Sequence, residues 1–229
     1  MSKAAVVQIQ SSTEKTENLR AALDLIKEAR SRGAELIAFP EFLMAFSPAS
    51  QSAEELSQIA ETTEGEFVSA LRDAAKAIGI AVLATIYEPA PVANRVYDSA
   101  VWIDALGNIA SVYRKLHLYD AFGFKESDKF YPGTVVAPPV PLGQCQFGVM
   151  ICYDLRFPEM ARMLALEGAN VLAAPSGWVQ GDLKVEHWQT MIKARALENG
   201  CYVAAPDQTG NIYIGHSMIV DPLGRTVVD

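Results

Sequence analysis

The sequence contains few cysteines and few histidines. Its 229 residues include three of each, and the cysteines, Cys145, Cys152 and Cys201, are too sparse for a disulfide framework. Such cysteine usage is typical of a reducing compartment, so we expect a cytoplasmic protein. The three histidines lie far apart along the chain, and none has the spacing of metal ligands, so we expect no metal centre.

Long apolar runs and an excess of positive charge are also missing. No window approaches the run of about 18 apolar residues that a membrane-spanning helix needs, and the N-terminus lacks the pattern of a signal peptide. Lys and Arg number 19 and Asp and Glu 27, a net charge of −8. A nucleic-acid-binding face needs the opposite balance, so we expect neither a nucleic acid nor a membrane as partner. A small anionic substrate stays possible, because a local cationic pocket can lie in an acidic protein.

What is present is the pattern of an α/β domain. Half of the residues are apolar and a fifth are charged, which excludes a disordered chain. Strand and helix patterns alternate with no low-complexity linker between them, so residues 1–229 are expected to form a single domain. The expected strands are 4–10, 36–39, 80–87, 97–104, 109–113, 147–151, 171–174, 202–205, 217–220 and 225–228, and the expected helices are 18–30, 64–78, 160–166 and 187–198.

One segment of the chain is echoed in another. Residues 32–41 and 167–176 each contain a glycine that ends a helix, a short apolar strand and then a proline. This echo suggests two sheets of like construction, packed on each other with helices outside. The alternative is that any α/β protein reuses this unit.

Cys152 lies where the apolar strand 147–151 gives way to polar residues, and Pro158 suits the start of a helix soon afterwards. The end of a strand is where α/β proteins present catalytic groups. A thiolate is a nucleophile, and a cationic neighbour or a helix N-terminus favours it. The alternative is that Cys152 is an inert, packed residue.

Two charged residues have similar positions. Glu41 follows the strand 36–39 and Pro40, where a carboxylate is a candidate general base; the alternative is a loop residue or a helix cap. Lys115 follows the strand 109–113 and is a candidate for stabilising an oxyanion; the alternative is a solvated lysine on an edge strand.

Three further residues are candidates. Glu126 lies in the long loop 124–139, where charged residues are usually solvated. Arg156 could hold a substrate carboxylate, or form a structural ion pair with an acid such as Asp154 or Glu159. Trp178 could line a pocket or pack in the core. A pairing of Cys152 with a histidine has no local signature in its favour.

Three segments together carry a resemblance to a known family. They are Ala38-Phe39-Pro40-Glu41, Tyr113-Arg114-Lys115-Leu116-His117-Leu118 and Gly148-Val149-Met150-Ile151-Cys152-Tyr153-Asp154-Leu155-Arg156-Phe157-Pro158-Glu159. In this order and context they resemble the nitrilase superfamily of carbon–nitrogen hydrolases, and the similarity covers essentially the whole chain. Glu126-Ser127 followed by Tyr131-Pro132-Gly133 looks most like the Nit and omega-amidase branch.

The resemblance implies both a fold and a site. The implied fold is a four-layer α-β-β-α sandwich. The implied catalytic triad is Glu41, Lys115 and Cys152, with Glu126 as an additional glutamate and the backbone N–H of Tyr153 assisting Lys115 at the oxyanion. Members of the superfamily need no metal or organic cofactor and form homodimers or higher homo-oligomers. They commonly run a few tens of residues past the Gly215-His216-Ser217 hairpin, so this chain is expected to lack such a tail or to be a piece of a longer one.

The implied reaction is hydrolysis of a small amide to an acid and ammonia through a thioester on Cys152. A carboxylate-bearing amide, of the omega-amidase or deaminated-glutathione type, is favoured because of Arg156 and the branch resemblance, with Trp178 as a further substrate contact. The alternatives are an N-carbamoyl amino acid or aliphatic amide hydrolase with the same triad, then a nitrilase, and last a non-catalytic binding protein. Retention of all three triad residues argues against that last reading.

Overall fold

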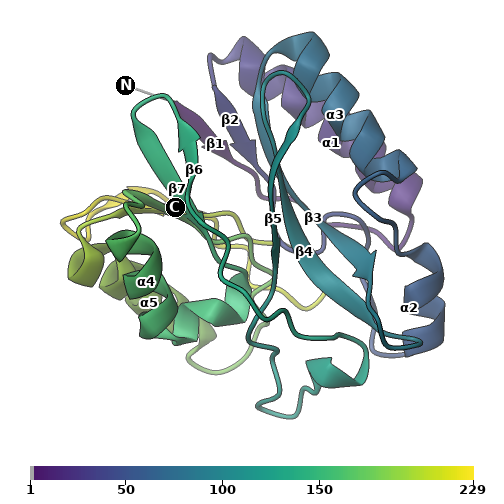
Figure 1. Ribbon diagram of the computed structural model, residues 1–229. Coiled ribbons are helices and arrows are strands. Elements are labelled where there is room, and N and C mark those ends of the chain that lie inside the picture. Colours follow the sequence, from purple (N-terminus) through teal and green to yellow (C-terminus); the bar gives the residue numbers. More distant parts are fainter. Residues whose placement is uncertain (1–2) are drawn as a thin grey trace.

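The computed structural model describes residues 3–229 and contains two β-sheets with helices on their outer faces (Figure 1). The first sheet has the strand order β1-β2-β3-β4-β5. Its strands are β1 (Ala4–Val6), β2 (Leu36–Ala38), β3 (Ala81–Pro89), β4 (Val96–Ile103) and β5 (Ile109–Arg114). Strands β1, β2 and β3 are parallel, and β4 and β5 extend the sheet by antiparallel pairing.

The second sheet repeats this construction. Its order is β11-β10-β9-β8-β7-β6, and β7, β8 and β9 are parallel. Its strands are β6 (Val140–Leu142), β7 (Cys145–Val149), β8 (Val171–Ala173), β9 (Tyr202–Ala205), β10 (Met218–Val220) and β11 (Thr226–Val228). The echoed segments 32–41 and 167–176 contain β2 and β8, and each is the middle strand of a parallel trio. The echo therefore marks the two halves, as the sequence suggested.

The helices form the outer layers. Helices α1 (Lys15–Ser31) and α3 (Glu66–Ile78) cover the first sheet, and α4 (Pro158–Leu166) and α5 (Lys184–Asn199) cover the second (Figure 1). Because side chains alternate along a strand, Ile37 of β2 packs with the α1 and α3 side chains, whereas Leu36 and Ala38 face the other sheet. This arrangement is the α-β-β-α sandwich that the resemblance implied.

Some elements differ from the sequence prediction. Helix α2 (Ala53–Ile59) was not predicted, although Ser52 and Glu55 form a capping box that is legible in the sequence. Strand β6 was also missed, because it lies at the end of a Pro-rich segment. The first strand stops at Val6, and Ile9 instead pairs with Gln208, which links the two halves.

The strand before Cys152 ends at Val149 rather than at Ile151. The residues that follow form a short 3-10 helix, η2 (Cys152–Arg156), so that the nucleophile candidate starts a turn. A second 3-10 helix, η1 (Glu126–Asp128), lies within the loop predicted at 124–139.

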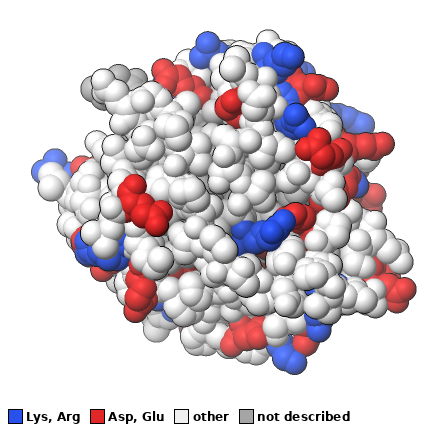
Figure 2. Space-filling view, viewed as in Figure 1, with Lys and Arg blue, Asp and Glu red and all other residues white. Residues whose placement is uncertain are grey.

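The surface carries both signs of charge. On the face shown in Figure 2, Lys and Arg side chains lie near Asp and Glu, and no continuous basic patch is visible. No helix within residues 3–229 has both the length and the apolar character needed to cross a membrane.

The packing between the sheets depends on Trp102 of β4, whose ring centroid lies 5.0 Å from that of Phe147 on β7. Trp102→Ala should lower the free energy of unfolding by about 3–5 kcal/mol, because it opens a cavity between the sheets. Leu106→Ala, at a hairpin turn where the side chain is 71% exposed, is the control and should change it by less than about 0.5 kcal/mol. Urea denaturation measures both; equal losses would contradict this account of the core.

Candidate active site

Four of the predicted residues line one cavity of about 430 Å³: Glu41, Lys115, Glu126 and Cys152. Glu41 follows β2, Lys115 follows β5 and Cys152 begins η2 shortly after β7. Strand β5 runs in the same direction as β2 and β3, because two successive antiparallel pairs reverse the chain twice. The carboxyl ends of strands from both sheets therefore meet at this cavity.

Lys115 is the centre of the polar contacts. Its buried ammonium donates to Glu41 Oε1 at 2.7 Å and to Glu126 Oε1 at 2.8 Å. Burial alone would lower the pKa of Lys115, but attraction by Glu126 and Glu41 outweighs it and holds the pKa well above its usual value. Lys115 is therefore a fixed cation rather than a proton donor or a solvated surface lysine.

Glu41 is held from both halves of the molecule. Besides the contact with Lys115, its Oε2 accepts the backbone N–H of Gly177 at 2.7 Å, just beyond β8. A side chain at Gly177 would place its Cβ 2.8 Å from the Tyr213 ring, so only glycine lets the backbone approach this closely. The residue just past the second echoed segment thus orients the carboxylate that ends the first.

Cys152 has a strained backbone and a buried thiol. Its φ of 45° lies in the left-handed region, which costs energy for a residue with a side chain and is common at active sites. Its N–H donates to the Pro175 carbonyl at 2.9 Å. Burial and the negative charge of Glu41 raise the pKa of Cys152 well above its usual value, and this outweighs the pull of Lys115. The resting group is therefore a thiol that needs a base.

Glu126 joins the site to a loop. One carboxylate oxygen accepts from Lys115, and the other accepts the backbone N–H of Tyr119 at 2.6 Å. Burial raises the pKa of Glu126, with Lys115 acting in the opposite direction. The sequence ranked this loop residue low because the fold that buries it was not visible from its neighbours.

Sequence reasoning missed Asp98 on β4. Its side chain is buried, its Oδ2 lies 3.9 Å from Lys115 Nζ, and within residues 3–229 neither oxygen has a hydrogen-bond partner. Burial and the charge of Glu41 raise the pKa of Asp98 well above its usual value. The signal in the sequence was an acidic residue within β4, whose other residues are apolar apart from Ser99.

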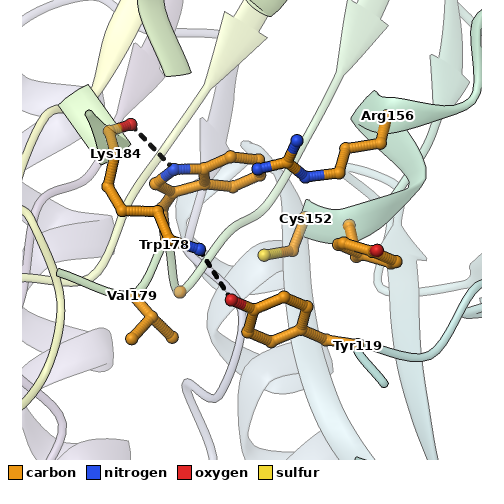
Figure 3. Close-up of a pocket in the computed structure, with 8 residues that line it drawn as sticks. Tyr119, Cys152, Arg156, Trp178, Val179 and Lys184 are labelled. Carbon is orange, nitrogen blue, oxygen red and sulfur yellow. Dashed lines mark hydrogen bonds between the residues drawn. The ribbon is translucent and has the colours of Figure 1, made fainter. Parts of the chain in front are cut away.

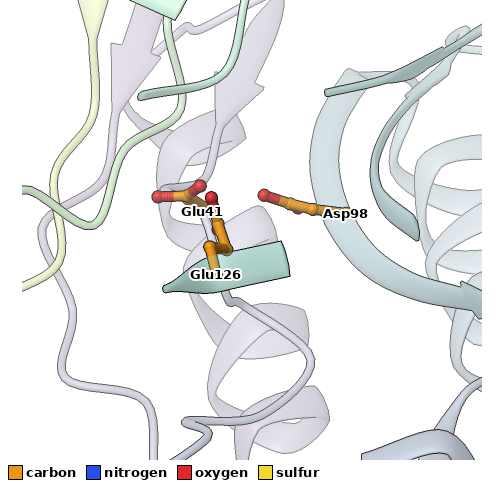
Figure 4. A group of neighbouring side chains, drawn as sticks. All are labelled: Glu41, Asp98 and Glu126. Carbon is orange, nitrogen blue, oxygen red and sulfur yellow. The ribbon is translucent and has the colours of Figure 1, made fainter. Parts of the chain in front are cut away.

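The three carboxylates of Glu41, Asp98 and Glu126 form one acidic cluster, with side-chain oxygens within 4.8 Å of one another (Figure 4). Such a group could in principle hold a metal ion. Here the Lys115 ammonium already lies among the three acids and supplies the cation that they need.

On the other side of Cys152 lies a cationic pocket (Figure 3). Its lining residues are Tyr119, Cys152, Tyr153, Arg156, Gly177, Trp178, Val179 and Lys184. The guanidinium of Arg156 lies 5.2 Å from the centre of the Trp178 ring. Trp178 also packs, with its ring 5.3 Å from that of Trp188, so both interpretations of Trp178 hold. Lys184, which the sequence analysis did not single out, donates to Tyr119 OH at 2.6 Å.

The structural interpretation of Arg156 fails. Within the described chain Arg156 forms no ion pair with Asp154 or Glu159. Asp154 instead accepts from Tyr113 OH at 2.6 Å and from the Ile151 N–H at 2.9 Å. The guanidinium of Arg156 therefore lines the pocket without an acidic partner.

The remaining candidates are the backbone N–H of Tyr153 and the histidines. The N–H of Tyr153 is in the first turn of η2, and no acceptor for it is present among residues 3–229. His117 stacks on Phe157 at 3.6 Å and contacts Asp154, and no histidine lines either side of the cavity. A Cys–His pair is therefore wrong for the described residues.

Asp98→Asn keeps the shape of Asp98 and removes its titration. A carboxyl with a raised folded-state pKa stabilises the fold below its unfolded pKa of about 3.9, and this contribution is lost as the pH rises through the folded pKa. The variant should therefore gain stability over the parent at about pH 8, and the gain should vanish toward pH 4. Urea denaturation across this range measures it; a gain independent of pH would contradict the raised pKa.

Comparison with known proteins identifies the family of the chain. The family model described as carbon-nitrogen hydrolase matches residues 3–229. The chain is 39% identical over 211 residues to a deaminated glutathione amidase of Escherichia coli O157:H7, covering 92% of this chain and 79% of that protein. It is 37% identical over 240 residues to a deaminated glutathione amidase of Synechocystis sp. (strain PCC 6803 / GT-S), covering 99% and 86%.

Solved structures of related proteins have a similar fold. The C. elegans NitFhit protein superimposes with a TM-score of 0.90 at 31% identity, covering 99% of this chain and 58% of that one. An amidase from Nesterenkonia sp. AN1, with acrylamide added at its active-site cysteine, gives a TM-score of 0.81 at 26% identity, covering 99% and 88%. From its motifs, its two-sheet sandwich and these matches, the chain belongs to the carbon–nitrogen hydrolase family, within the nitrilase superfamily.

Proposed function

We propose that the protein is a cysteine-dependent amidase that hydrolyses small carboxylate-bearing amides. The observation that carries the proposal is the convergence of Glu41, Lys115 and Cys152 on one cavity, with the ammonium of Lys115 2.7 Å from the Glu41 carboxylate. A base, a fixed cation and a thiol are the groups that acyl transfer through a thioester requires. The family membership and the relatives named deaminated glutathione amidase support the same reaction class.

In the first half of the reaction Glu41 takes the proton of the Cys152 thiol, and the sulfur attacks the amide carbon. Lys115 and the Tyr153 N–H stabilise the oxyanion that forms; one such donor typically contributes about 3–4 kcal/mol. The carbon–nitrogen bond then breaks, and protonated Glu41 returns its proton to the departing nitrogen. Ammonia or an amine leaves, and the acyl group remains on Cys152 as a thioester.

In the second half Glu41 takes a proton from water, and the resulting hydroxide attacks the thioester carbon. The carbon–sulfur bond breaks, the acid is released, and the thiolate regains a proton from Glu41. Glu126 acts as a positioning residue, because it holds Lys115 at 2.8 Å and the Tyr119 backbone at 2.6 Å.

Charge conservation within the cavity makes the first proton transfer feasible. Moving a proton from the Cys152 thiol to Glu41 shifts a negative charge from oxygen to sulfur without creating a new buried charge. Lys115 is close enough to both groups for its charge to act on each of them. A bare thiolate in an apolar pocket would lack this compensation.

The preference for a carboxylate rests on Arg156, which faces the pocket without an acidic partner, and on Trp178, which supports its guanidinium.

We further propose that residues 1–229 form one catalytic domain that acts in the cytoplasm, as the free thiols among the described residues suggest. Exposed apolar side chains on α4, α5 and the β10–β11 hairpin support self-association into a homodimer or a higher homo-oligomer: Met163, Leu166, Leu197, Leu223 and Val227.

Cys152→Ala should lower the turnover number for amides about ten-thousand-fold or more, because no other group can form the thioester. Release of ammonia or amine is measured with deaminated glutathione, 2-oxoglutaramate, an N-carbamoyl amino acid, a neutral aliphatic amide and a nitrile. Cys145→Ala is the control and should retain the activity of the parent. Retained turnover in a folded Cys152→Ala variant would refute the nucleophile, and release only from the carbamoyl compound or the nitrile would refute the substrate class.

Arg156→Lys should raise the KM for carboxylate-bearing amides about tenfold or more, because lysine cannot form the paired hydrogen bonds of a guanidinium. The KM for a neutral amide should change little. Initial-rate kinetics on an amide pair matched in length decides the matter, and equal effects on both substrates would remove the assigned role of Arg156.

A further inference from the structure

Two cations, rather than one, face the cationic pocket beside Cys152. Arg156 comes from η2 and Lys184 from the first turn of α5, which lie far apart in the sequence but line the same pocket (Figure 3). None of the eight residues that line this pocket is an Asp or a Glu. The pocket therefore carries two positive charges and no lining residue that compensates them.

Neither cation is neutralised elsewhere. Among residues 3–229, Arg156 and Lys184 take part in no ion pair, whereas Lys115, Lys125 and Arg195 all do. The partners of the two cations are chiefly aromatic faces: Arg156 lies 5.2 Å from the Trp178 ring centre, and Lys184 lies 4.6 Å from that of Phe122. Burial, and next the charge of Arg156, lower the pKa of Lys184.

Both side chains have more hydrogen-bond donors than they use in contacts with the described residues. Lys184 has three N–H donors and directs one hydrogen bond to Tyr119 OH. Arg156 has five donors, and its one polar contact is with His187 Nδ1 at 3.5 Å, while its buried Nε has no partner in the described chain. Two like charges held together with unused donors make a site for an anion with several acceptor oxygens.

We propose that Arg156 and Lys184 together form a two-cation subsite for a carboxylate of the substrate, and that Lys184 is a specificity-determining residue of the amidase. This inference deepens the proposed function, since Arg156 alone would select a carboxylate less strongly. Tyr119 belongs to the same arrangement: its hydroxyl orients Lys184, and its backbone N–H is held by Glu126. The anion subsite and the acidic cluster around Lys115 thus share one connecting segment.

Binding rather than turnover tests the subsite, so that its failure is separate from failure of the amidase proposal. The background is Cys152→Ala, which cannot turn over. The two probes are the monoamide of glutaric acid and pentanediamide, which match in length and differ by one carboxylate. Isothermal titration calorimetry measures their dissociation constants with Lys184→Met, with Lys184→Arg, and with Lys193→Met as a matched control on the same helix.

Lys184→Met should weaken binding of the monoamide about tenfold or more and leave binding of the diamide nearly unchanged. Lys184→Arg should restore most of the loss, and Lys193→Met should have no effect on either ligand. Equal losses for the two probes would show a structural role and overturn the proposal. An unchanged monoamide affinity in Lys184→Met, or no detectable binding of the monoamide to the Cys152→Ala protein, would also overturn it.

A second pair of ligands shows which side of the scissile bond carries the carboxylate. N-acetylglycine places it on the amine side, whereas the glutaric monoamide places it on the acyl side. A loss on Lys184→Met that is confined to one of the two ligands supports the subsite and assigns the side, and a loss with neither overturns it.

Discussion

A single buried ammonium organises this molecule. The cation of Lys115 lies among Glu41, which follows β2, Glu126 of η1 and Asp98 of β4. A buried charge without partners would cost several kcal/mol, and each carboxylate would cost as much without the cation. The contacts of Lys115 form only when these segments are in place together. The geometry of the candidate site and the folding of the first sheet are therefore linked through one ion-pair network.

The second constraint is the packing of two similar halves. Glu41 ends the first echoed segment, and the backbone N–H of Gly177, just past the second, fixes its carboxylate at 2.7 Å. Cys152 is anchored within its own half, through its N–H to the carbonyl of Pro175, which follows the neighbouring strand β8, at 2.9 Å. The proposed base and the proposed nucleophile thus follow strands of different sheets, and the sandwich brings them to one cavity. A displacement of one sheet relative to the other would separate them.

Cys152 divides the cavity into two chemical regions. On one side lie the acids and Lys115. Burial and the charge of Glu41 raise the pKa of the Cys152 thiol and keep it protonated at rest, although Lys115 acts in the opposite direction. On the other side, Arg156 and Lys184 lie on aromatic rings and present positive charge without acids. A buried thiol with a raised pKa is poorly reactive toward oxidants and weak electrophiles. In the proposed reaction, its reactivity depends on a substrate that is held beside Glu41 and Lys115.

The sequence by itself determined the alternation of strands and helices, the two like halves and the motifs around Glu41, Lys115 and Cys152. These features are local, since apolar periodicity, turn residues and short motifs need no distant partner. The elements that the sequence analysis missed also have local causes. Strand β6 lies in a Pro-rich segment that is not typical of a strand, and helix α2 could have been predicted from its capping box. Only the tertiary structure decided that Asp98 joins the cluster, that Glu126 is buried, and that Lys184 lies beside Arg156. The burial of those residues, and the charges beside them, are due to segments that are remote in the chain. Contacts between remote segments produce no periodic pattern or fixed spacing in a single sequence.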